Sequence, residues 1–255
     1  MRGKVISVAN QKGGVGKTTT AINLSASLAV AEKKILVIDI DPQGNSSSGL
    51  SFQNSQPSVY DLLIGDAKLP ETIVKDVVPY LDLIPATIDL VGAEVELLEM
   101  EDREYILKER IEKARSQYDY IFIDCPPTLG ILTLNALTAS DSVLIPVQCE
   151  YFALEGLGQL LKTIKLVKDR FNKNLSIEGV ILTMYDARLK LSEQVAEEVR
   201  KYFEDKVFST KIHRNVRVSE APSHGKPVLM YDALSMGAKN YLELAQEFLG
   251  RNKKK

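Results

Sequence analysis

The chain has few of the residues that mark secreted or metal-centred proteins. Its 255 residues include two cysteines and two histidines, too few for a disulfide framework and without the spacing of metal ligands. Cys125 and Cys149 both lie in apolar stretches, and we expect them to be buried thiols, as unpaired cysteines commonly are. This use of cysteine predicts a reducing, cytoplasmic setting.

Long hydrophobic runs are also missing. Apolar stretches such as Tyr120–Ile123 and Val143–Val147 have the length of a strand and fall far short of the roughly 20 residues that cross a bilayer. The N-terminus passes from Met1-Arg2-Gly3-Lys4 directly into a strand-like segment, so we expect neither a signal peptide nor a transit peptide.

A general excess of positive charge is absent, because the formal net charge is −2. This balance argues against a protein that binds nucleic acid through a surface that is basic throughout. Residues 185–255, however, carry 14 Lys and Arg against 10 Asp and Glu, a net of +4. Two interpretations stay open for this basic third: a solvated face with a frayed tail, or a surface that meets a polyanion.

Short apolar runs alternate with longer amphipathic stretches, which is the pattern of βαβ units around a parallel sheet. We expect strands at Lys4–Ala9, Lys34–Ile40, Tyr80–Ile84, Tyr118–Asp124, Ser142–Val147 and Glu178–Met184. We expect helices at Lys17–Ala31, Arg103–Gln117, Leu129–Ala139, Leu154–Phe171, Leu191–Phe203 and Met236–Leu249. The polar segment Gln43–Pro57 is typical of a mobile loop. The prediction is a single-domain α/β fold, with a mostly parallel twisted sheet and helices on both faces.

The first strand leads into a glycine-rich turn that ends in Lys-Thr and opens a helix, which is the context of a phosphate-binding loop. The glycines let backbone N–H groups point at phosphates, and Lys17 adds a positive charge at the helix N-terminus. Thr18 supplies a hydroxyl where Mg²⁺ takes an oxygen ligand. The sequence therefore predicts a P-loop that binds ATP and Mg²⁺ through Lys12, Gly13, Gly14, Val15, Gly16, Lys17, Thr18 and Thr19.

The loop departs from the standard pattern G-x-x-x-x-G-K-[ST] at its start. The first glycine would fall at Gln11, and the next residue is a second lysine, Lys12. Lys12 is too close to Lys17 to be a redundant phosphate ligand in the same subunit. We therefore expect one of the two lysines to reach across to the nucleotide of another copy. The run K-G-G-V-G-K-T-T resembles the deviant Walker A loop of the ParA/MinD superfamily. The resemblance implies that Lys12 contacts nucleotide in the partner of an ATP-sandwich homodimer and stabilises transition-state charge, as an arginine finger does in trans.

Carboxylates follow two of the expected strands. Asp39 and Asp41 end the second strand, at the edge where open α/β sheets bind ligands. Asp39 suits either a structural role, bonding loop N–H groups, or a role in the site, whereas Asp41 matches the family aspartate that orients the attacking water. Asp124 closes the strand before Cys125-Pro126-Pro127, which is where a Walker B carboxylate is aimed at Mg²⁺. We therefore expect Lys12, Lys17 and Asp41 in catalysis, and Thr18 and Asp124 at the metal.

The resemblance continues through residues 148–156, 183–188 and 214–225 and is closest to the chromosomal ParA proteins of the Soj branch. It implies that Asn215 lies beside the nucleobase. His213 stands where the family usually has proline, so its contact with the base is an open question. Arg188 and Arg217 match basic positions that face DNA, with solvated or ion-paired side chains as the alternative. Lys190, Arg214 and Lys239 are less securely matched neighbours.

The family resemblance implies a chromosome or plasmid partitioning switch. Its ATP-bound dimer would bind double-stranded DNA without sequence specificity, and a ParB-type centromere-binding protein would stimulate hydrolysis and release it. Residues 1–250 would form the ATPase domain and residues 251–255 a basic tail. We expect a cytoplasmic, nucleoid-associated protein.

Other members of the superfamily provide the alternatives. A MinD-like division-site ATPase would need an amphipathic membrane anchor after the domain, and residues 250–255 offer no apolar side chains for insertion. A nitrogenase-type reductase would need cluster-ligating cysteines at the dimer axis, and Cys125 falls in the Walker B turn instead. An ATP-dependent amidase would need a further domain, for which we expect too little length. We also expect no operator-specific repression, because no helix-turn-helix extension precedes the first strand.

Overall fold

The computed structural model describes residues 2–52, 57–150 and 153–253. Its centre is a seven-stranded sheet in the order β3-β4-β2-β5-β1-β6-β7. The strands are β1 (Lys4–Val8), β2 (Ile35–Asp39), β3 (Val74–Val78), β4 (Leu81–Ile84), β5 (Tyr120–Asp124), β6 (Ser142–Gln148) and β7 (Ser176–Thr183). All neighbouring pairs are parallel except β3 and β4. The predicted mostly parallel sheet is confirmed.

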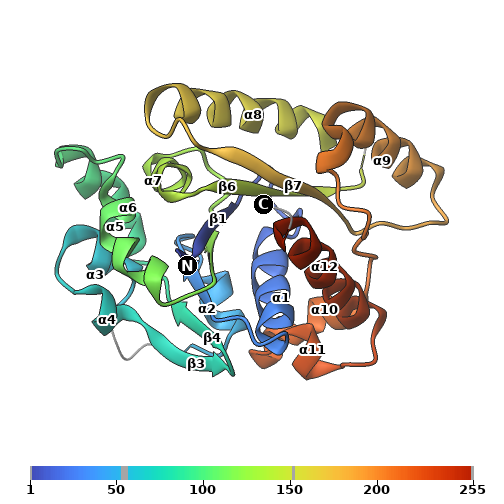
Figure 1. Cartoon of the computed structure of the whole chain (residues 1–255), viewed down its shortest axis with the longest axis horizontal. Coiled ribbons are helices and arrows are strands. Elements are labelled where there is room, and N and C mark those ends of the chain that lie inside the picture. The colour runs from blue at the N-terminus through green and yellow to red at the C-terminus, as the bar shows by residue number, and fades with distance from the viewer. Residues whose placement is uncertain (1, 53–56, 151–152, 254–255) are drawn as a thin grey trace.

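Helices cover both faces of this sheet (Figure 1). One face carries α1 (Lys17–Val30), α10 (Val216–Glu220), α11 (Val228–Tyr231) and α12 (Met236–Lys253), and the other carries α7 (Ile131–Ala139), α8 (Ala153–Arg170) and α9 (Lys190–Phe203). Shorter helices gather toward the β3 side of the sheet: α3 (Val59–Ile64), α4 (Leu69–Thr72), α5 (Leu90–Glu96) and α6 (Ile106–Ile111). The helix α2 (Asn45–Gly49) follows β2.

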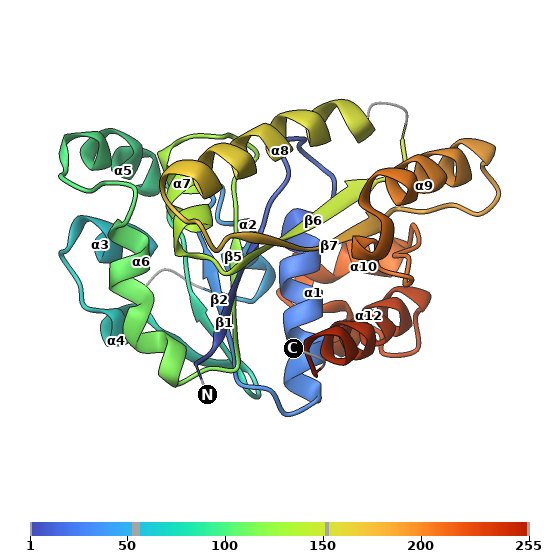
Figure 2. The same ribbon diagram turned by 45° about the horizontal axis from the view of Figure 1, so that its top comes forward.

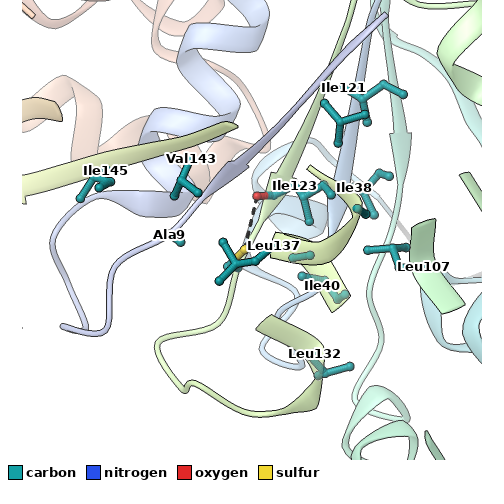
Figure 3. Close-up of a cluster of buried hydrophobic side chains, with 14 of the residues drawn as sticks. Ala9, Ile38, Ile40, Leu107, Ile121, Ile123, Leu132, Leu137, Val143 and Ile145 are labelled. Atoms are coloured by element: carbon teal, nitrogen blue, oxygen red, sulfur yellow. Dashed lines mark hydrogen bonds between the residues drawn. The ribbon is translucent and has the colours of Figure 1, made fainter. Parts of the chain in front are cut away.

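The core consists of two apolar layers because successive strand residues point to opposite faces. In β1, Val5 belongs to the layer under α7 and α8, while Ile6 packs in the layer with α1 and α12. Figure 3 shows part of the first layer, including Ile121 and Ile123. The buried Cys125 belongs to the same layer, and its Sγ lies 3.7 Å from the Ile123 carbonyl oxygen. Cys125 and Cys149 are both free and buried, as expected.

Two strand and loop expectations were wrong. The strand β3 was not predicted, because Lys75 and Asp76 interrupt its apolar residues. It lies at the edge of the sheet and lacks the continuous hydrophobicity of a strand buried on both faces. The segment Gln43–Pro57 is not simply a mobile loop, since it contains α2; its residues 53–56 lie outside the described residues.

Two helix expectations also need correction. The expected helix Arg103–Gln117 begins only at Ile106 and tightens into a 3₁₀ segment, Glu112–Ser116. The last helix extends to Lys253, four residues past the expected Leu249. Within the described part of the chain, no helix is both long enough and apolar enough to cross a membrane.

Arg251 lies in the extended last helix and joins it to the segment after α9. Its guanidinium donates to the Val207 carbonyl oxygen at 2.7 Å and to Glu247 at 2.8 Å. It also stacks 4.1 Å from the centre of the Phe208 ring. Arg251, the first residue of the expected basic tail, is therefore held against the domain by these contacts.

Replacing Arg251 tests this anchor. Arg251→Ala should lower the free energy of unfolding by about 1–2 kcal/mol, because carbonyl and carboxylate groups lose a charged donor. Urea denaturation measures the change. The control is Lys253→Ala, two residues along the same helix with an exposed side chain, which should change the stability little. Equal effects of the two substitutions would show that Arg251 contributes no anchor.

Candidate nucleotide site

The glycine-rich loop connects β1 to α1 at the carboxyl end of the central strand. Because β1 lies between β5 and β6, the loop opens at the reversal of strand order, where α/β sheets bind ligands. Gly14 and Gly16 have φ of 73° and 89°, which explains glycine at both positions. Gly16 caps α1 without any side-chain hydrogen bond, so the first N–H groups of the helix point into the loop and suit an anion.

Lys17 is buried at the base of this loop. Its Nζ donates to the Lys12 carbonyl oxygen at 3.3 Å, a weak contact that holds the side chain back along the loop. Burial lowers the pKa of Lys17, and the nearby charges of Asp124 and Asp41 oppose that shift. A buried ammonium in a nest of backbone N–H groups is an arrangement that attracts phosphate.

Asp39 and Asp124 end the neighbouring strands β2 and β5 at the same register position. Asp39 is fully buried and accepts hydrogen bonds from the Ser47 N–H at 2.8 Å and the Ser47 hydroxyl at 2.7 Å. It also accepts one from the Asp41 N–H at 3.2 Å. Burial and the adjacent Asp124 raise the pKa of Asp39. These contacts correspond to the structural alternative, in which Asp39 bonds loop N–H groups.

Asp124 is fully buried and only partly satisfied. Its Oδ2 accepts from the Ser46 hydroxyl at 2.8 Å, and its Oδ1 has no hydrogen-bond partner among the described residues. Burial raises the pKa of Asp124, while the nearby Thr18 hydroxyl, the Ser46 hydrogen bond and the charge of Lys17 oppose the shift. A buried carboxylate oxygen without a partner, next to a threonine hydroxyl, is a donor set that fits Mg²⁺.

Asp41 lies just past the end of β2 and is 6% exposed. Its Oδ1 accepts from the Gln43 N–H at 3.0 Å, which fixes the turn that leads to α2. Its charge is close enough to Lys17 to influence the pKa of that lysine. The structure thus brings Lys17, Asp41 and Asp124 into one group.

Ser46 and Ser47 are site residues that the sequence analysis missed. Both are buried in α2, and their hydroxyls bind Asp124 and Asp39 respectively. The Ser47 hydroxyl also accepts from the Ala86 N–H at 2.9 Å. The only signal was the run Ser46-Ser47-Ser48 after Asp41, and its polar composition is equally typical of a loop.

The Lys12 side chain has an ion-pair partner of its own. Its Nζ is 3.7 Å from Glu150 Oε2, and its side chain is 32% exposed. Glu150 is also 3.7 Å from Arg214. Tyr151 and Phe152, which follow Glu150 in the motif at 148–156, lie outside the described residues. The two loop lysines therefore face different surroundings, one inside the subunit and one at its surface.

A cavity of about 210 Å³ opens beside the loop. Its wall includes His213 and Asn215, the two residues considered for contact with the nucleobase. It is lined by Gly16, Thr19, Thr183, Met184, Ile212, His213, Arg214, Asn215, Val218, Ser219, Pro222 and Tyr241. The Asn215 side-chain oxygen caps α10 by accepting from the Arg217 N–H at 2.9 Å, so its amide NH₂ remains to meet a ligand. His213 is held in the wall by Asn240, whose Oδ1 lies 3.0 Å from His213 Nδ1.

The two arginines expected to face DNA are exposed but ion-paired. Arg188 is 87% exposed and binds Asp186, with Nη2 to Oδ2 at 2.6 Å, which lowers the pKa of Asp186 to about 2. Arg217 binds Glu220 at 2.8 Å and Asp232 at 3.3 Å. Exposed pairs of this kind are weak. The less securely matched Lys190, Arg214 and Lys239 are all exposed.

Comparison with known proteins assigns the family. A family profile described as an AAA domain matches residues 3–177. The Bacillus subtilis sporulation initiation inhibitor protein Soj is 59% identical, over 96% of this chain and 98% of that protein. The Myxococcus xanthus chromosome partitioning protein ParA is 53% identical, over 98% and 89%. The chain belongs to the ParA/Soj family of chromosome-partitioning ATPases.

A solved structure from Mycobacterium smegmatis has a similar fold and length but is described as a different enzyme. It is described as cobyrinic acid a,c-diamide synthase with a bound ATP analogue and magnesium, and it matches with a TM-score of 0.85 and 38% identity, over 98% of this chain and 96% of that one. The argument that an amidase needs a longer chain is therefore wrong, because a chain of this length carries that description. The family assignment depends on the higher identity to Soj and ParA.

Removing the charge of Asp124 should stabilise the protein without ligand. Asp124→Asn keeps the shape but relieves a buried charge beside Asp39, so we expect the free energy of unfolding to rise by about 1–3 kcal/mol at pH 8. Because the folded-state pKa is raised above that of the unfolded chain, the gain should shrink as the pH falls toward 4. Denaturation at several pH values measures this effect.

The matched control is Asp89→Asn, an exposed carboxylate at the start of α5, which should change the stability by only a few tenths of a kcal/mol at either pH. An Asp124→Asn protein less stable than the wild type at pH 8 would contradict the picture of an unsatisfied buried charge.

Proposed function

We propose that the chain is an ATP-dependent partitioning switch, in which two copies enclose ATP and Mg²⁺, bind DNA without sequence preference and release it on hydrolysis. A ParB-type centromere-binding protein stimulates that hydrolysis. The protein works in the cytoplasm, associated with the nucleoid. The observation that carries the proposal is the different surroundings of the two loop lysine side chains: Lys17 is buried in its own site, and Lys12 is partly exposed beside Glu150.

In this proposal, the backbone N–H groups of residues 13–19 and the Lys17 ammonium bind the phosphates. The base enters the cavity next to the Asn215 amide, with His213 in the wall. Thr18 and Asp124 hold Mg²⁺, which when bound neutralises charge on the β- and γ-phosphates. Asp41 accepts a hydrogen bond from the attacking water and orients it for in-line attack. Glu150 competes with the partner's nucleotide for Lys12.

Lys12 is the first residue to test. Lys12→Ala should leave ATP binding largely intact, because Lys17 and the loop backbone remain. It should abolish ATP-dependent dimerisation and lower hydrolysis on the order of 10³-fold, the scale of a catalytic charge supplied in trans. Sedimentation velocity with ATP and a fluorescent-nucleotide titration measure the two properties.

The matched control is Lys34→Ala, an exposed lysine beside the start of β2, at the opposite end of the sheet. It should behave as the wild type in both assays. A Lys12→Ala protein that still dimerises with ATP would remove the argument for a lysine acting in trans.

Dimerisation supplies the DNA switch. One subunit offers about three phosphate contacts, from Arg188, Arg217 and a neighbour such as Arg214, and counterion release then gives a log–log salt slope of about −2.7. Two subunits held together by ATP double the contacts, with a slope of about −5.4, and the second set binds at high effective concentration. The existing pairs with Asp186, Glu220 and Asp232 must open, which keeps the monomer's affinity low.

The Asp41→Ala variant is suited to measuring DNA binding by the dimer. It should bind ATP and dimerise, but hydrolyse ATP too slowly to return to the monomer. With ATP it should bind random-sequence duplex DNA with the steeper salt slope. Adding Arg217→Glu should nearly eliminate binding, while Arg217→Glu alone keeps the basal rate of ATP hydrolysis. Fluorescence anisotropy against salt concentration measures both. Equal DNA affinity with ADP and ATP would refute the switch.

The MinD-like alternative has less support from the last helix. Tyr241, Leu244, Ala245 and Phe248 of α12 are all buried in the apolar layer shared with α1. These four side chains are therefore not available to insert into a lipid surface. Liposome binding with ATP is the assay in which a MinD-like activity would be seen.

A further inference from the structure

The cavity beside the P-loop has two polar side chains whose orientation the protein itself fixes. It lies where the start of α1, the end of β7, α10 and α12 come together, and α10 and α12 lie beside α1 in both views (Figures 1 and 2). His213 and Asn215 are part of its wall. Each is held by a hydrogen bond that determines which of its polar atoms is left for a ligand.

Asn240, a buried residue of α12, determines where the proton of the His213 ring lies. Its Oδ1 accepts from the His213 backbone N–H at 3.1 Å, and because a backbone N–H can only donate, this contact identifies the atom as the amide oxygen. The same oxygen lies 3.0 Å from His213 Nδ1. An amide oxygen has no proton to donate, so Nδ1 carries the hydrogen. In the neutral ring the other nitrogen, Nε2, is then an acceptor.

The His213 ring keeps this acceptor available and in a fixed position. Among the described residues no group bonds Nε2, and this atom is not one of the enclosed polar atoms without a partner. The ring is perpendicular to that of Tyr185, with centroids 5.5 Å apart and planes at 83°. A bridge between the backbones of Tyr185 and His213 also holds the segment. The acceptor is therefore positioned before a ligand enters.

Asn215 has the opposite polarity. Its side-chain oxygen accepts from the Arg217 N–H at 2.9 Å and from the Val218 N–H at 3.4 Å. These backbone donors fix the amide in the same way as in Asn240, so the atom that Asn215 leaves for a ligand is its NH₂ group. The cavity wall thus offers one acceptor, from His213, and one donor, from Asn215.

We propose that His213 is the residue that selects adenine over guanine, with Asn240 as its positioning residue; the inference rests on the proposed function. Adenine has the N6 amino donor beside the N7 acceptor, whereas guanine has the O6 acceptor in place of N6. The N6 amino group donates to His213 Nε2, and the Asn215 amide donates to a neighbouring ring nitrogen. Guanine would place O6 against Nε2, and two acceptors without a proton between them leave both unsatisfied.

The ligand side of this contact can be tested in the unaltered protein with nucleoside diphosphates, which still bind the P-loop. Purine riboside 5′-diphosphate lacks only the N6 amino group of ADP. It should bind about tenfold more weakly than ADP, the effect of one hydrogen bond. GDP should bind at least about 100-fold more weakly, because it leaves polar groups unpaired. Isothermal titration calorimetry at pH 8 measures the three dissociation constants.

The protein side is tested with His213→Phe, which keeps a ring against Tyr185 and removes Nε2. This variant should bind ADP about tenfold more weakly and purine riboside 5′-diphosphate with the wild-type affinity, because only a hydrogen bond between the two altered groups couples their effects. Asn240→Leu should also reduce the preference for ADP over purine riboside 5′-diphosphate, since the ring proton can then occupy either nitrogen.

The matched control is His224→Phe, at the other histidine of the chain, which stacks on Tyr231 with centroids 4.8 Å apart and is not part of the cavity wall. It should bind all three diphosphates as the wild type does. An unchanged preference for ADP in His213→Phe would overturn the role of His213, and so would equal binding of ADP and purine riboside 5′-diphosphate by the wild type. A wild-type protein that binds none of the three would instead defeat the proposed function.

Discussion

Three carboxylates and one ammonium group meet at the carboxyl ends of β1, β2 and β5, and strand register brings them there. The pairing of Asp39 with Asp124 across β2 and β5 places two buried acids side by side, while β1 delivers the loop that ends in Lys17. Burial alone would penalise each charge. The cost is reduced because the Ser47 hydroxyl donates to Asp39 and the Ser46 hydroxyl to one oxygen of Asp124, and these hydrogen bonds hold α2 beside the two strands.

Two members of this group lack full hydrogen-bonding partners, which makes the group a candidate ligand site. Asp124 keeps an oxygen without a described partner, and Lys17 holds only a weak contact to a carbonyl group. A cation beside Asp124 and a polyanion beside Lys17 would resolve both deficits, and a nucleotide with its metal supplies the two together. We therefore expect the local structure to be less stable than it would be with neutral side chains, as is common where function requires poorly paired groups.

Much of this arrangement could be predicted because it is local in sequence. The glycine loop, Asp41 and Asp124 each follow an apolar strand directly, so periodicity and motif place them together. Ser46 and Ser47 could not be predicted, since their role depends on which strands become neighbours. The contact of Lys12 with Glu150 joins residues far apart in the chain, and the ion pairs of Arg188 and Arg217 depend on loop geometry. The α5 region gave no strong signal because residues 88–98 are apolar on both sides, which obscures the helical period.

The charge distribution is uneven along the chain. A net charge of −2 conceals a net of −6 in residues 88–104 and of +4 in the C-terminal third. If the chain binds DNA as proposed, the duplex should therefore meet the C-terminal third and be repelled by residues 88–104.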